Sequence, residues 1–163
     1  MCADQKPRRK EREMNTDVLQ GVLEDLIETL EDGKRGFQQA ADTLVESDPD
    51  LAHRLRELGA ERDRFSVELR ELATRQGYPV SEEGSVAGAF HRGWITLKEA
   101  LATNDRLAVL GAAEAGEDHA VTEFESALES ELSEEVRSVV GRQTNAIRKA
   151  HDEVRSLRDG KVS

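Results

Sequence analysis

Acidic side chains at helical spacing are the groups in this sequence best suited to bind a metal ion. Glu61 and Glu68 share a stripe with apolar neighbours in one segment, and Glu114 and Glu117 do so in another. Steps of three and four residues place side chains on one face of a helix, so these acids lie on the core-facing side. A buried carboxylate needs a nearby cation or a proton. We therefore expect either metal or internal ion pairs in the core.

The metal hypothesis uses oxygen and nitrogen ligands together, as borderline divalent cations such as iron accept. Its candidate ligands are Glu68, Glu114, Glu117 and either His91 or His119. The second hypothesis is a structural polar network, which needs no metal. Its candidate members are Glu61, Arg62, Arg64, Arg92 and Gln143, with Lys98 as a further cation. We favour the network, because four basic residues lie in the matching segments.

A complete di-iron centre is not predicted. Di-iron proteins built on four-helix bundles take a Glu from each of two helices and a Glu-x-x-His pair from each of the others. The residues three positions before the four histidines are Asp50, Gly88, Gly116 and Arg148. None of them is glutamate, so the metal hypothesis requires a divergent site.

Motifs of other chemistries are missing from the sequence. It has no glycine-rich phosphate loop with lysine and no nucleophile elbow, and its only cysteine is Cys2. His151 and Asp152 lie in a densely charged segment, where we expect them to be solvated. We therefore predict no catalytic residue and no required cofactor, and whether the protein is an enzyme stays open, with a non-enzymatic role favoured.

Composition restricts the partners and the compartment. The 163 residues include 34 acidic and 23 basic side chains, for a net charge of −11. Nucleic acid and anionic membranes are poor partners for such a chain, because phosphate binding needs an excess of Lys and Arg. A single cysteine forms no intrachain disulfide, and no apolar run approaches the roughly 18 residues of a membrane span. We predict a cytoplasmic protein and leave homo-oligomers and small-molecule partners open.

Apolar periodicity and capping residues define the elements that carry these side chains. Residues 1–14 read as a disordered basic tail and residues 15–160 as one domain. The first helix is expected to start after Asn15–Asp17, the second after Asp48, and the last after Ser133. Short connections make the first and last helix pairs antiparallel. The prediction is an all-α four-helix bundle of two antiparallel pairs.

The segment between the pairs, residues 77–104, is too long for a hairpin. We expect a crossover along the bundle that contains a helix of roughly 16 residues, which would span about 24 Å, with a break at 103–105. Within it, GSVAGAFHRGW at 84–94 combines small residues with two aromatic side chains, Phe90 and Trp94, which we expect to anchor the crossover. The alternative is a ligand pocket formed by His91, Arg92 and Trp94.

Several pieces of the chain resemble a family of bacterial ferritin-like four-helix-bundle proteins of unknown function. The matching pieces are residues 25–44, 62–69, 84–94, 114–128 and 142–159. The resemblance covers about residues 17–159, and the run that ends in His91, Arg92 and Trp94 is its most specific part. It implies a ferritin-like fold and no particular activity.

The predicted function follows from these points. We expect an acidic helical-bundle protein without a complete di-iron motif, in a binding or stress-related role by analogy. The alternative is a divergent carboxylate metal protein with oxidase or metal-storage activity.

Overall fold

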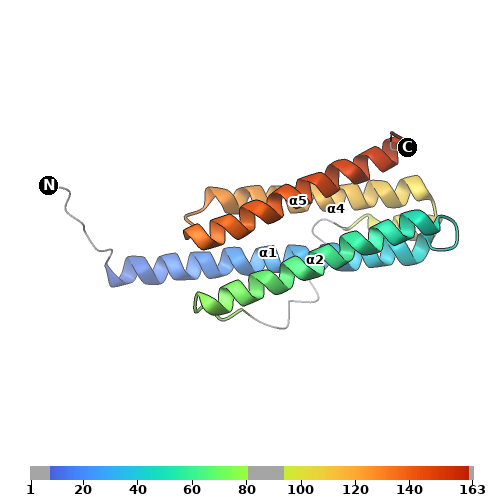
Figure 1. The fold of residues 1–163 in the computed structure, drawn as a ribbon. Helices are drawn as coiled ribbons and strands as arrows, with labels where there is room; N and C mark the ends of the chain where they lie inside the picture. The colour runs from blue at the N-terminus through green and yellow to red at the C-terminus, as the bar shows by residue number, and fades with distance from the viewer. Residues whose placement is uncertain (1–7, 81–93, 162–163) are drawn as a thin grey trace.

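Five α-helices account for most of the chain. The computed structural model describes residues 8–80 and 94–161. Their helices are α1 (Arg9–Leu44), α2 (Pro49–Arg75), α3 (Leu97–Thr103), α4 (Arg106–Glu129) and α5 (Glu134–Asp159) (Figure 1). The described ranges contain no β-strand, so the all-helical prediction is confirmed for them.

The four long helices form two antiparallel pairs. α1 and α2 make one hairpin, and α4 and α5 make the other (Figure 1). α2 ends at one end of the bundle and α4 begins at the other, so these two helices run in the same direction (Figure 1). α1 also packs against α4, and α2 against α5. The two antiparallel pairs are those that the sequence predicts.

Side-chain caps set most of the helix boundaries where the sequence predicts them. Asp48 accepts a hydrogen bond from the Leu51 amide at 3.1 Å, and Pro49 occupies the first helical position of α2. Ser133 caps α5 in the same way. At the end of α5, Gly160 takes φ 69°, a left-handed conformation that glycine adopts without a steric penalty.

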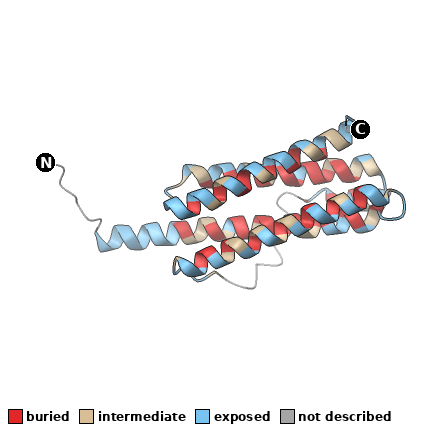
Figure 2. Ribbon diagram, in the orientation of Figure 1, coloured by how far each residue is buried: buried red, intermediate tan, exposed pale blue. Residues whose placement is uncertain are grey.

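The start of α1 differs from the prediction. The helix begins at Arg9 instead of after Asn15–Asp17, and residues 8–18 are exposed on an extension beyond the bundle (Figure 2). The Glu11 carboxylate accepts a hydrogen bond from the Arg8 amide at 3.0 Å, which caps this earlier start. The extension consists largely of good helix formers, Arg, Lys, Glu and Met, and this favours continuation of the helix past the polar triplet.

The crossover helix is also shorter than expected. α3 has seven residues instead of roughly 16, and the predicted break follows it. Asn104 adopts φ 51°, in the left-handed region, and Asp105 caps α4 by accepting from the Leu107 amide at 3.0 Å. Residues 81–93, which include Phe90, His91 and Arg92, lie outside the described residues.

Trp94 fits between two helices at places where glycine leaves room for its ring. It is 2% exposed. A Cβ built on Gly36 of α1 or on Gly116 of α4 would lie 2.6 Å from a ring atom of Trp94, well inside contact distance. Phe37 meets the ring edge-on, with centroids 5.2 Å apart. The residue thus joins the crossover to α1 and α4.

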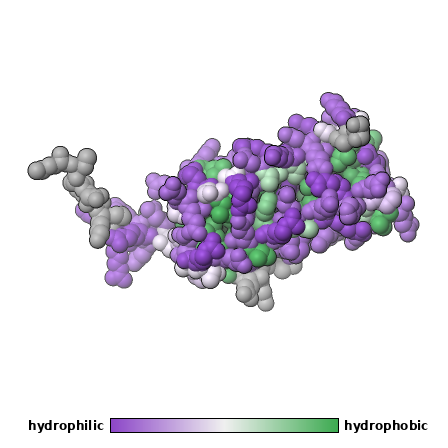
Figure 3. All heavy atoms as spheres, in the orientation of Figure 1, coloured by the Kyte–Doolittle hydropathy of each residue, from purple (hydrophilic) through white to green (hydrophobic). Residues whose placement is uncertain are grey.

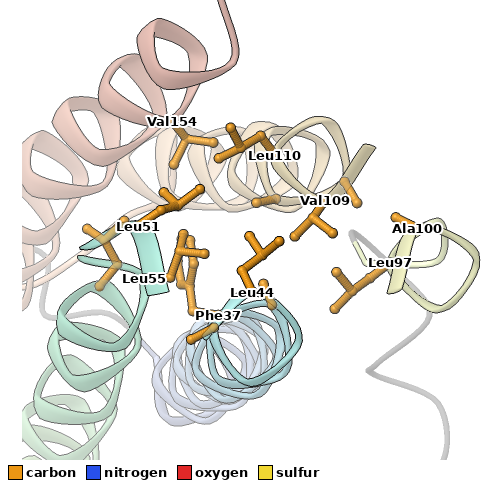
Figure 4. Packing of buried hydrophobic residues seen from close by; sticks show 14 of the residues in the cluster. Phe37, Leu44, Leu51, Leu55, Leu97, Ala100, Val109, Leu110 and Val154 are labelled. Atoms are coloured by element: carbon orange, nitrogen blue, oxygen red, sulfur yellow. The ribbon is translucent and has the colours of Figure 1, made fainter. Parts of the chain in front are cut away.

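The apolar core has two parts. Side chains from α1 to α5 converge at one end of the bundle, where Figure 4 shows Phe37, Leu44, Leu51, Leu55, Leu97, Val109, Leu110 and Val154. The second part, toward the other end, includes Leu23, Leu26, Leu30, Leu72, Phe124, Val140 and Ile147. Figure 2 shows the buried residues on the inward faces of the helices, and the face seen in Figure 3 is largely hydrophilic.

Polar residues and glycine separate the two parts along α1, α2 and α4. We call this set the polar layer. Its buried members are Asp32, Gly33, Arg62, Ser66, Glu114 and Glu117. The layer contains the chemistry that the acidic stripes predict.

Candidate functional site

A buried ion pair occupies the polar layer. Arg62 on α2 is 1% exposed, and its Nη2 lies 2.5 Å from a carboxylate oxygen of Glu117 on α4, which is fully buried. Its Nη1 donates to Glu61 at 2.8 Å. The guanidinium carbon lies 5.8 Å from the Phe37 ring centroid and 6.0 Å from that of Phe65, within the range of cation–π attraction. Arg62 is therefore held by two acids and two aromatic rings.

Burial governs the ionisation of this pair. Desolvation raises the pKa of Glu117 above its ordinary value, and the charge and hydrogen bond of Arg62 act against that rise. For Arg62, desolvation lowers the pKa, but Glu117 and Glu61 outweigh it, so the pKa is raised. Arg62 thus stays charged in the core, while Glu117 is the member of the pair that titrates.

The arrangement does not fit a di-iron centre. Such a centre places its metal ions among carboxylates on the inward faces of the four helices. Here the guanidinium of Arg62 engages both Glu61 and Glu117, two of the acids on those faces. Arg62 therefore supplies the positive charge that these two buried or half-buried acids need.

Glu114, the other buried acid of α4, pairs with arginines of α5. It accepts from Arg155 Nε at 2.9 Å and also contacts Arg158. The hydrogen bond to Glu114 raises the pKa of Arg155. Arg155 and Arg158 are not among the cations that the sequence analysis names. Of the named cations, Arg62 pairs with Glu117, and Arg64 and Lys98 are exposed. Arg92 lies outside the described residues.

Glu68 belongs to a separate polar contact between α2 and α5. It is half-buried, contacts Arg142, and accepts from the Gln143 amide at 2.8 Å. Gln143, which is fully buried, also donates to the backbone oxygen of Phe65. The predicted polar network is therefore divided, with Glu61 and Arg62 in one cluster and Gln143 in another.

The predicted metal ligands do not gather as one set among the described residues. Glu114 and Glu117 are buried within the bundle, each with its own arginine partner. His119 is half-buried on α4. His91 lies outside the described residues.

A different trio brings potential ligand atoms together. Glu114 and Asp118 on α4 and His151 on α5 each place one ligand atom within 4.8 Å of the others, and no second such group occurs in the described ranges. His151 is 9% exposed, which corrects the expectation that it is solvated. Spacing explains the burial: Ile147, His151 and Val154 follow steps of four and three, so the histidine shares the core-facing stripe of α5.

The atoms of this trio converge without making a proper hydrogen bond. His151 Nε2 lies 2.6 Å from Asp118 Oδ1. Yet Nε2 is buried and has no partner with hydrogen-bond geometry among the described atoms. A buried imidazole nitrogen without a hydrogen bond, beside a carboxylate, is a candidate metal ligand.

The other side of the histidine ring has a carboxylate neighbour. Nδ1 of His151 lies 3.2 Å from Oδ1 of Asp152. A metal-binding histidine commonly donates its second ring N–H to a carboxylate, which fixes the tautomer and orients the ring. Asp152 therefore stands where it can orient Nε2 toward Asp118 and Glu114.

Acids of α4 face basic residues of α5 along this seam. Glu125 pairs with Arg148 at 2.6 Å, and Glu114 pairs with Arg155 and Arg158. Between these pairs, Asp118 faces His151, the one partner in the row that can offer a nitrogen lone pair. Among the basic residues of this row, His151 is therefore the one that can bind a metal ion.

No helix in the described part of the chain is both long and apolar enough to cross a membrane. A search of curated proteins found no match to this chain. A family described as "Domain of unknown function (DUF2383)" matches residues 19–131, which include most of α1 and all of α2, α3 and α4. Arg62, Trp94, Glu114 and Glu117 lie within the match. The match extends over more than half of the sequence, and the chain belongs to this family.

Proposed function

We propose that this protein is a ferritin-like helical bundle that binds a single divalent metal ion through Glu114, Asp118 and His151. The observation that carries the proposal is the close, misaligned approach of His151 Nε2 to Asp118 Oδ1 beside the buried Glu114. The function is metal binding, and no reaction is assigned to the site.

Topology supports the ferritin-like part of this proposal. Two antiparallel helix pairs joined by one long crossover distinguish ferritin-like bundles from up-down-up-down bundles. Here α2 and α4 run in the same direction and the connection between them contains α3. The resemblance of residues 17–159 to a ferritin-like family points the same way.

The ligand set indicates the class of metal. One imidazole nitrogen and two carboxylate oxygens suit Zn²⁺, Mn²⁺ or Fe²⁺ better than a soft, thiolate-preferring ion. Three protein ligands leave at least one coordination position for water or another molecule. The Asp118 side chain is 61% exposed, so an ion reaches the site from solvent.

Metal content and titration test this function. The purified protein is incubated with Zn²⁺, Mn²⁺ or Fe²⁺ in turn, dialysed, and analysed for metal per chain. We expect close to one ion per chain for at least one metal, and loss of that ion in His151→Ala and in Asp118→Asn. Absence of stoichiometric metal from the unmodified protein would contradict the proposal.

Two controls separate this site from the other acidic positions. His119→Ala removes a half-buried histidine of α4 that is not a member of the trio. Glu68→Gln removes an acid that is engaged by Arg142 and Gln143. Both variants should keep the bound ion. If either loses it while His151→Ala keeps it, the metal lies elsewhere.

A further inference from the structure

The first turns of α1 protrude from the bundle without packing on it. Residues 8–18 are exposed, and Figure 2 shows them beyond the ends of the other long helices. We call residues 8–18 the protruding segment. At a rise of about 1.5 Å per residue it is about 16 Å long. It therefore offers a helical surface that the described part of its own bundle does not cover.

An apolar stripe runs along the protruding segment. Met14 and Val18 are 65% and 62% exposed, although both are large apolar side chains. They lie four residues apart and therefore on one face of the helix. Gly21 continues this face, and a Cβ built there would meet nothing within 4 Å. The face is thus apolar and leaves room for the close approach of a second helix.

Charge is distributed unevenly along α1. Residues 8–12 include four basic side chains and one acidic side chain, a net charge of +3. Residues 13–28 include five acidic side chains and no Lys or Arg. Within the helix, Arg9 pairs with Glu13, but both side chains are exposed, and such pairs contribute only about 0 to 1 kcal/mol. The helix therefore has a positive start and a longer negative stretch after it.

The end of α4 adds negative charge beside this stretch of α1. Asp25 of α1 and Glu123 of α4 line one hollow between the two helices. Residues 121–136 include six acidic side chains and no Lys or Arg. Three arginines from elsewhere reach them: Arg75 pairs with Glu135, Arg148 pairs with Glu125, and Arg137 donates to the backbone oxygens of Leu128 and Ser130. Six acids against three arginines leave a net charge of −3 there.

We propose that two copies of this chain associate through their protruding segments, as an antiparallel helix pair around a two-fold axis. In this pair Met14 of each copy packs against Val18 of the other. The same register places residue 8 of one copy opposite residue 24 of the other, so each positive start lies beside the negative stretch of its partner. A parallel pair would instead bring the two positive starts together, which their charge disfavours.

Self-complementarity is the reason for choosing a second copy as the partner. A two-fold interface uses the same surface patch on both copies. The protruding segment and the stretch that follows it carry the apolar stripe, the positive charge and the negative charge that such an interface needs. The inference does not depend on the proposed metal site, because none of these residues belongs to the trio.

Sedimentation equilibrium tests the association over a range of about 10 to 500 µM, where small interfaces form and dissociate. The mean mass should rise from that of one chain toward that of two. It should rise less in about 1 M sodium chloride, where the screening length falls to about 3 Å. A chain that begins at Met14 lacks the positive start and should associate more weakly than the full chain.

Exchange of charges between two variants tests the antiparallel arrangement. The first variant combines Arg8→Glu with Lys10→Glu, and the second combines Glu24→Lys with Asp25→Lys. Each variant alone opposes like charges in both halves of the interface and should stay monomeric. An equal mixture opposes unlike charges in both halves and should form a heterodimer, which also demonstrates that both variants are folded.

Neutral substitutions test the apolar stripe. Met14→Gln and Val18→Gln should each raise the dissociation constant by about tenfold, because apolar surface no longer leaves water when the copies meet. Leu107→Gln is the matched control: Leu107 is 55% exposed on α4, outside the stripe, and its replacement should not change the dissociation constant. Circular dichroism verifies that each variant keeps its helix content.

Three results would overturn the inference. The first is a single-chain mass at every concentration, which would assign the protruding segment to a different chain or to no partner. The second is a dimer that Leu107→Gln weakens and Met14→Gln does not, which would place the interface elsewhere. The third is a mixture of the two charge variants that stays monomeric.

Discussion

Arg62 Nη2 and the Glu117 carboxylate lie 2.5 Å apart inside the bundle, and both side chains are about 1% exposed. The pair connects α2 to α4 in the polar layer, between the two apolar parts of the core. Glu61, which is part-exposed, gives Arg62 a second acid. Arg62 therefore has an alternative partner, whereas Glu117 has no other basic group within ion-pair distance among the described residues.

We predict an asymmetry between the two halves of this pair. Arg62→Met leaves Glu117 buried without its cation and should lower the free energy of unfolding at pH 7 by about 3 to 5 kcal/mol. Glu117→Gln should change it much less, because the amide oxygen still accepts from Arg62 and Glu61 still balances the charge. Urea unfolding followed by circular dichroism measures both. Equal losses in the two variants would contradict this account.

A double variant tests whether the charge on Glu117 causes the loss. Arg62→Met combined with Glu117→Gln should recover much of the stability that Arg62→Met alone removes. Arg148→Met provides the control, since its pair with Glu125 is about half exposed and such pairs contribute only about 0 to 1 kcal/mol.

The pH dependence of stability should reveal Glu117. Its pKa is raised in the folded protein from an ordinary value of 4.5, so the folded state binds this proton more tightly than the unfolded state. The contribution of Glu117 to stability is therefore greatest below pH 4.5 and is lost as the pH rises through the raised pKa. The difference in unfolding free energy between the unmodified protein and Glu117→Gln should shrink or reverse as the pH rises from 4 to 8. A difference that stays constant from pH 4 to pH 8 would contradict a raised pKa for Glu117.

Trp94 should be a major anchor of the crossover. Trp94→Ala removes a buried ring that lies between Gly36 and Gly116 and should cost about 3 to 5 kcal/mol. Thermal and urea unfolding measure the loss. A negligible change would exclude the anchoring role.

Gly116 should tolerate alanine only when the ring is gone. Gly116→Ala places a methyl group against Trp94 and should destabilise by about 1 to 3 kcal/mol. In the Trp94→Ala background the same change should be neutral or stabilising, because alanine favours helix by about 1 kcal/mol over glycine. Gly111→Ala, on the same helix with nothing within 4 Å of the added atom, should be neutral or stabilising in either background.

The extension at the start of α1 should contribute little to the stability of the bundle. Residues 8–18 are exposed, and Leu19 is the first buried residue of the helix. A protein that begins at Met14 should therefore unfold within about 0.5 kcal/mol of the full chain, as for changes at exposed surface positions. A loss of several kcal/mol would show that the extension packs against the bundle.

Local chemistry was sufficient to predict the four long helices and most of their ends. Asp48, Ser133 and Gly160 act within one turn of their own positions, so their effect is readable from the sequence. The predicted break at 103–105 has the same origin in Asn104 and Asp105. The first boundary was wrong for a related reason: Asn15–Asp17 can cap a helix, but the residues before it are good helix formers and extend it to Arg9.

Periodicity also predicted the acidic faces, because spacing shows which side chains share one side of a helix. It placed Glu114 and Glu117 toward the core, where the structure has them buried. It did not show which cation each acid meets. The partner of each acid depends on the register and rotation of one helix relative to its neighbour, and the sequence of a single helix does not show these.

Tertiary structure therefore decided the candidate site. Glu114 meets Arg155 and Arg158, about 40 residues later, only because α4 and α5 pack antiparallel in one particular register. The same register brings His151 to Asp118. His151 lies on a core-facing stripe that the sequence does contain, but its charged neighbours favoured a solvated position. The sequence by itself determined the elements and their polar faces, and the packing of the helices determined which of those polar groups meet.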